Sequence, residues 1–191
     1  MKKTGRIVIT TVLLLAHPVS VFADTRDIAK LTAAAKNGDA IAQYNLGEAY
    51  LLGNGVDKDG DQAARWYRKS ASQDYAPAEY RLGALYVRVE GNPQTDVLED
   101  PLLADKWLHK AAEQGSGDAM RTLGRMYQSG AGVDKNEVQA FMWLDLAAAE
   151  NDASGTELRN AMLKSMSPDK LAEARNLSDK WKRDHPKLFP Q

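Results

Sequence analysis

Histidine and acidic side chains are the residues of this 191-residue chain whose types could support catalysis or metal binding. His109 and His185 are the two histidines beyond the first 23 residues, and neither stands at a metal-ligand spacing from another His, Asp or Glu. The absence of cysteine excludes disulfides, thiolate metal sites and a cysteine nucleophile. No G-x-S-x-G, H-E-x-x-H or phosphate-binding glycine loop occurs. We therefore expect no catalytic residue, no metal site and no cofactor, and we expect His109 to be an exposed polar residue on a helix.

One acidic segment, DKDGD at residues 57–61, has the composition of a calcium-binding loop. Such a loop places acids at positions 1, 3 and 5, glycine at position 6 and glutamate at position 12. Counted from Asp57, position 6 is Gln62 and position 12 is Arg68. Because the turn glycine and the bidentate ligand are both missing, we interpret the segment as a solvated loop between two helices.

A second acidic segment, at residues 88–100, holds Glu90, Asp96, Glu99 and Asp100. Loops accept added residues at a small cost in closure entropy. Two interpretations therefore stay open: an incidental insertion, or a contact point for a basic partner.

The first 23 residues have the layout of a secretory signal peptide. Three basic residues at 2–6 precede an apolar run at 7–16, and the small-residue ending VFA occupies 21–23. A membrane span needs roughly 20 apolar residues, and this run is about half that length. We expect cleavage near Ala23 and a periplasmic or secreted protein with no stable membrane span.

Removal of that segment leaves 22 basic and 26 acidic side chains. Nucleic-acid-binding proteins usually present a basic patch or stripe, so we expect no nucleic-acid partner. The remaining chain is long enough for one domain with a hydrophobic core. Without disulfides, side-chain packing must supply its stability.

The elements that carry these residues repeat. LGEAYLLGNGV at 46–56 and LGRMYQSGAGV at 123–133 are near copies, with the shorter LGALY between them at 82–86. A tryptophan and small residues follow each copy. The offsets are 36 and 41 residues, and the five additional residues of the second unit lie between Tyr86 and Ala104. A fixed period of this size is typical of a solenoid.

Each half of the repeat has helical periodicity. Ala42, Leu46 and Tyr50 are spaced i, i+4, i+8 and form one apolar stripe. Glycines of GNGV and GAGV stand where a left-handed residue ends a helix. Further helices are expected at 26–36 and from Ser167 to about Lys182, where Ser167 and Pro168 form a start signal.

The three mid-helix glycines are each unfavourable by about 1 kcal/mol relative to alanine, which indicates close approach of a neighbouring helix. We expect these glycines and the small residues near them to form a notch in the first helix. The tryptophan of each second helix should pack into this notch and contribute to the core. The residues concerned are Gly47, Gly83 and Gly124, with Trp66, Trp107 and Trp143.

The pattern resembles the Sel-1-like repeat family, relatives of the tetratricopeptide repeats. AIAQYNLGEAYLLGNGV followed by AARWYRKSA matches the family's A-x-A-x-x-x-L-G-x-x-Y-x-x-G-x-G-V and A-x-x-W-x-x-x-A-A. The resemblance implies an all-α, right-handed αα-hairpin solenoid with three full repeats plus capping helices. The expected divisions are a signal peptide (1–23), an N-terminal capping helix (24–37), three repeats (38–152) and a C-terminal partial repeat with a capping helix (153–191).

The resemblance also implies a concave face built from fixed positions of each first helix. In each repeat these positions are spaced i, i+4, i+7, which places them on one stripe. The stripe is aromatic and apolar in two repeats and basic in the third, and an extended peptide with an acidic end would suit it. Ordinary solvated helix positions are the alternative. The candidate partner-binding residues are Tyr44, Glu48, Leu51, Tyr80, Val87, Arg88, Arg121, Arg125 and Gln128, with Ala84 at the equivalent central position of the second repeat.

The resulting functional hypothesis is a periplasmic adaptor or regulator that binds a protein or peptide on the concave face and is not an enzyme. An envelope or signalling protein is the expected partner. The alternative is a hydrolase of cell-wall material or an antibiotic, an activity suggested for cysteine-rich relatives. This chain has no cysteine. The sequence does not separate an adaptor from a structural component of an envelope assembly.

Overall fold

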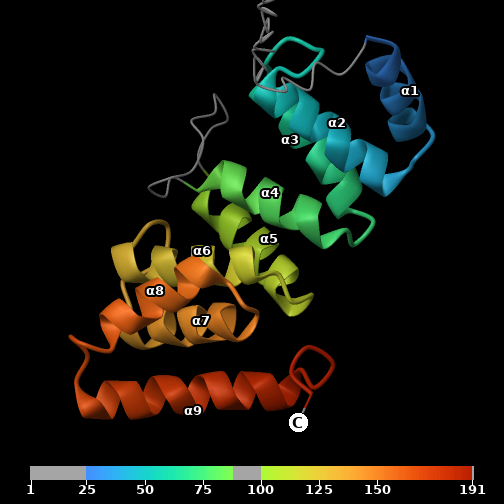
Figure 1. Ribbon diagram of the computed structural model, residues 1–191. Coiled ribbons are helices and arrows are strands. Elements are labelled where there is room, and N and C mark those ends of the chain that lie inside the picture. The colour runs from blue at the N-terminus through green and yellow to red at the C-terminus, as the bar shows by residue number, and fades with distance from the viewer. Residues whose placement is uncertain (1–24, 88–99, 191) are drawn as a thin grey trace, which may run out of the picture.

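The computed structural model describes residues 25–87 and 100–190, and within them it contains nine α-helices and no strand. Three helix pairs, α2–α3, α4–α5 and α6–α7, stack on one another, with α1 against α2 at one end and α8 and α9 against α7 at the other (Figure 1). This confirms the expected all-α solenoid, while the predicted signal peptide lies outside the described residues. The helices are α1 Thr25–Lys36, α2 Ala40–Leu52, α3 Gly60–Ala71, α4 Ala76–Tyr86, α5 Pro101–Glu113, α6 Gly117–Ser129, α7 Glu137–Ala149, α8 Ala153–Met162 and α9 Pro168–Asp184.

Side-chain caps explain where most of the helices begin. Asp100 accepts a hydrogen bond from the backbone N–H of Leu103 at 3.0 Å, directly before the first-turn Pro101. Ser167 caps α9 in the same way, as predicted. At the other end of α2 and α6, Gly53 and Gly130 adopt φ values of 75° and 82°. Glycine reaches this left-handed region without the penalty of a Cβ atom.

The mid-helix glycines mark the close contact within each pair, but their partner is not the tryptophan. A Cβ added to each would lie 2.6 to 2.8 Å from a large side chain of the second helix. That side chain belongs to the residue after the tryptophan, so this prediction was wrong. Adjacent helical residues differ by about 100° around the axis, and this rotation turns the tryptophan away from the notch. The contacts are Gly47 with Tyr67, Gly83 with Leu108 and Gly124 with Leu144.

The tryptophans pack elsewhere in the structure instead. Trp66 is buried in a cluster that α1 and α2 complete, and Trp143 is buried in the main core, where Trp181 of α9 meets it edge-on at 6.0 Å. Their predicted role in core packing is confirmed, whereas Trp107 is half-buried and packs against the main core from outside. Trp143 also covers His109, with ring centroids 5.1 Å apart. His109 is therefore half-buried, not exposed as predicted, because the next repeat supplies an aromatic ring against it.

Candidate partner-binding groove

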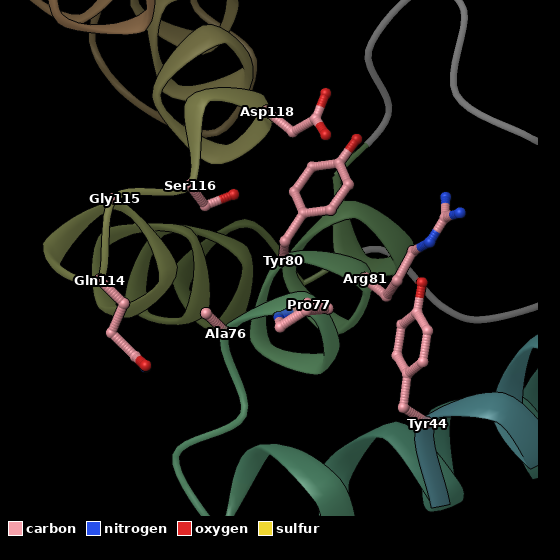
Figure 2. A pocket seen from close by; sticks show the side chains of 9 residues that line it. All are labelled: Tyr44, Ala76, Pro77, Tyr80, Arg81, Gln114, Gly115, Ser116 and Asp118. Atoms are coloured by element: carbon pink, nitrogen blue, oxygen red, sulfur yellow. The ribbon is translucent and has the colours of Figure 1, made fainter. Parts of the chain in front are cut away.

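A groove with a volume of about 510 Å³ crosses the face where successive repeats meet (Figure 2). Tyr44 of α2 forms one side, and Tyr80 of α4 forms the other. Ala76 and Pro77, in the first turn of α4, also line it. The turn from α5 to α6 contributes Gln114, Gly115 and Ser116, and α6 contributes Asp118. The groove therefore draws on three consecutive repeats, and no single repeat could form it alone.

The two tyrosines occupy equivalent positions of successive repeats, and both are half-buried. Tyr44 is held by ring contacts with Tyr67, at 5.8 Å between centroids, and with Tyr75, at 5.5 Å. Burial and then the charge of Asp118 raise the pKa of Tyr80, so its hydroxyl stays neutral. The groove thus offers two aromatic walls, each with a hydroxyl group at its tip.

An ion pair between repeats lies at the Tyr44 end. Arg81 of α4 approaches Glu48 of α2 through two nitrogens, at 2.9 and 3.1 Å. Tyr67 donates a further hydrogen bond to the same carboxylate. Burial and the neighbouring Glu48 both raise the pKa of Tyr67, which keeps its proton in place. Glu48 is therefore committed to contacts within the protein.

A second ion cluster lies at the opposite end. Arg121 of α6 contacts Asp118 at 2.5 Å, and it also contacts Asp152, the capping residue of α8. Two carboxylates share this one guanidinium group. The side chain of Asp118 is 55% exposed and lines the groove, whereas that of Asp152 is buried.

A third cluster lies beneath the groove. Glu79 of α4 is fully buried, 2.9 Å from the ammonium of Lys110 in α5, and Gln114 donates a hydrogen bond to it at 2.6 Å. Lys110 also contacts the exposed carboxylate of Asp74 at 2.6 Å. Burial raises the pKa of Glu79, and the contact with Lys110 opposes that shift. The cluster joins α4 to α5 and fixes Gln114 at the groove wall.

Only some residues of the predicted partner-binding stripe lie at the groove. Tyr44 and Tyr80 line the groove, and Glu48 and Arg121 border it through their ion pairs. Leu51, Ala84 and Val87 are buried, with Leu51 and Val87 in the main core cluster. They do not belong to the groove, because burial of an apolar side chain gains about 1.5–3 kcal/mol and leaves nothing for a partner to contact. Arg125 and Gln128 are half-buried and do not line the groove, and the predicted site residue Arg88 lies outside the described residues.

Sequence reasoning missed several residues of the groove. Pro77, Arg81, Gln114, Ser116 and Asp118 were not predicted. Their positions depend on how the α5–α6 turn meets the start of α4, and a helical stripe contains no information on that contact. Pro77 was available as a signal, since a first-turn proline marks a helix start at the surface.

The described residues contain no group of three or more His, Asp or Glu side chains that could hold a metal ion. Within the same part of the chain, no helix is both long and apolar enough to cross a membrane.

Stacked helix pairs and a groove shared between them define a helical-repeat interaction scaffold. The family model of the Sel1 repeat matches residues 40–75, 76–116 and 117–152, and the chain belongs to this family. Members of the family generally act as protein–protein interaction adaptors or regulators.

Relatives with curated names include the alginate biosynthesis protein AlgK of Pseudomonas syringae, 29% identical over 85% of this chain and 34% of the relative. Chitin synthase regulatory factor 3 of Schizosaccharomyces pombe is 34% identical over 59% of this chain and 12% of the relative. Among solved structures, a protective antigen of uropathogenic Escherichia coli with an SLR fold is 34% identical. It aligns with a TM-score of 0.74 over 86% of this chain and 34% of that one. This chain thus spans about a third or less of the length of these relatives.

Proposed function

We propose that this protein is an adaptor that holds an extended segment of a partner protein in the groove between Tyr44 and Tyr80. One observation carries the proposal: the groove is assembled from three consecutive repeats, with half-exposed tyrosines at equivalent positions on its two sides. Tyrosine is enriched among residues that dominate binding energy at protein interfaces. Its ring gives a large contact area while it loses few rotatable bonds.

Removal of both tyrosine side chains tests the groove. We expect the double variant Tyr44→Ala, Tyr80→Ala to weaken partner binding about 30-fold or more, since a hot-spot residue contributes about 2 kcal/mol or more. The partner is first captured by cross-linking from the envelope fraction, and its affinity is then measured by calorimetry with the purified pair.

The matched control is Ile41→Ala, Leu52→Ala. These side chains also lie on α2, are 56% and 59% exposed, and do not line the groove. The control should bind as the wild type does, and circular dichroism should show that both variants are folded. A partner that the tyrosine variant binds with wild-type affinity would place the interface elsewhere.

We further propose that the adaptor works in the periplasm after cleavage near Ala23. The basic, apolar and small-residue segments at 2–23 support this, although they lie outside the described residues. The expected result is a mature protein that begins at Asp24 in the periplasmic fraction, measured by intact mass. A full-length protein retained in the cytoplasm would contradict it.

A further inference from the structure

The ion clusters around the groove carry an excess of acidic side chains. In its three ion clusters, five carboxylates share three cationic side chains. Glu48 is balanced by Arg81, so the Tyr44 end is neutral. At the α5–α6 end Asp118 and Asp152 share Arg121, and beneath the groove Asp74 and Glu79 share Lys110.

The cations of the groove are already occupied, which disfavours an acidic ligand. Arg81 makes two contacts with Glu48, and Arg121 contacts two carboxylates. The N-terminus of α4 is also a poor anion site, although it opens into the groove. Pro77 has no N–H, and the next two N–H groups both bond to the carbonyl of Tyr75, at 2.9 and 3.1 Å.

Asp118 is the charge that a ligand can reach. Its side chain is the more exposed member of its cluster, and its carboxylate lies beside Tyr80 at the upper edge of the groove (Figure 2). Since Asp152 also contacts Arg121, Asp118 can share its charge with an incoming cation without leaving the guanidinium unpaired. Aromatic faces attract cations by about 0.5 to 2 kcal/mol, and the apolar stem of a long basic side chain packs well on proline and tyrosine rings.

We propose that the groove selects a partner segment that carries an arginine or lysine, whose stem lies on Pro77 between Tyr44 and Tyr80 and whose charge faces Asp118. This inference rests on the proposed function, because it names the chemistry of the segment that the adaptor holds. It reverses the sequence-based expectation of an acidic peptide, since Arg121 is paired with two carboxylates.

A random octapeptide library displayed on phage tests the inference without a known partner. The purified wild-type chain selects binders, and those that the Tyr44→Ala, Tyr80→Ala variant also retains are removed. We expect the remaining, groove-dependent peptides to be enriched in arginine and lysine. Groove-dependent peptides that are neutral or acidic would overturn the basic-ligand inference and leave the adaptor proposal standing. A selection that yields no groove-dependent peptide would overturn both.

A charge-removal cycle then tests Asp118 itself. One selected peptide is synthesised with its arginine, or with the neutral isostere citrulline. On the wild type, citrulline should raise Kd about tenfold, the effect of one favourable charge pair. On Asp118→Asn the two peptides should differ by less than about twofold. An equal loss on both proteins would remove Asp118 from the proposed site.

The chain offers a matched control for this cycle. Glu137 is also an acidic residue in the first turn of a helix, α7, and it also pairs with one basic side chain, Lys170, at 2.8 Å. Glu137→Gln should leave the tenfold preference unchanged. A loss of preference in this variant as well would show that overall charge, and not the groove, discriminates between the peptides.

Discussion

Gly124→Ala lowers the free energy of unfolding by about 1–3 kcal/mol, although alanine is the better helix former by about 1 kcal/mol. The added Cβ would lie 2.7 Å from Cγ of Leu144 and 3.2 Å from the backbone oxygen of Ala140. Leu144 is fully buried, so it cannot move out into solvent. Urea unfolding followed by circular dichroism measures the loss.

In a Leu144→Ala background, the effect of Gly124→Ala on the free energy of unfolding is expected to change sign. Leu144→Ala alone should lose about 2–5 kcal/mol, because it leaves a cavity. In that background the methyl group of Gly124→Ala enters the vacated space, so the same substitution should now stabilise the protein by up to about 1 kcal/mol. Gly117→Ala is the control on the same helix, since its Cβ would meet Cβ of Glu150 at an ordinary 3.4 Å. Additive losses in the double variant would disprove the notch.

The notch also shows what the sequence could and could not predict. The period of the sequence repeat located the helix pairs, because the same apolar stripe recurs three times. It did not settle which residue of the second helix enters the notch, since tryptophan and its successor are both large. The residue that follows the tryptophan has a large, mainly apolar side chain in every repeat: Tyr67, Leu108 and Leu144. That regularity could have signalled the contact.

The candidate groove was predicted less completely than the fold. Tyr44 and Tyr80 could be found because they repeat at one position of the helical pair. The ion pairs could not be found in this way, since Arg81 contacts Glu48 across 33 residues and Arg121 contacts Asp152 across 31. Such contacts depend on how one repeat is rotated against the next. Helical spacing reports only the face on which a residue lies.

Lys110→Met is expected to lower the free energy of unfolding by about 3 kcal/mol near pH 7. The substitution leaves the carboxylate of Glu79 fully buried without its cation, 2.9 Å from where the ammonium stood. Breaking a buried ion pair from one side costs about 3–5 kcal/mol. Lys110 is 37% exposed and Gln114 keeps its hydrogen bond to Glu79, and both place this loss at the lower end. The comparison variant is Lys170→Met, which removes the exposed pair with Glu137 and should lose less than about 0.5 kcal/mol.

The loss in Lys110→Met should also depend on pH. Burial raises the pKa of Glu79 in the folded protein, and removal of Lys110 removes a contact that lowers it. The folded state then binds this proton more tightly than the unfolded state, so stability falls as pH rises above the ordinary value of 4.5. The deficit should therefore be larger at pH 8 than at pH 5 in urea unfolding. Adding Glu79→Gln should restore most of the stability and remove the pH dependence, because a neutral amide no longer requires a cation. A loss of stability of equal size at both pH values would mean that lost packing, and not the buried charge, causes the loss.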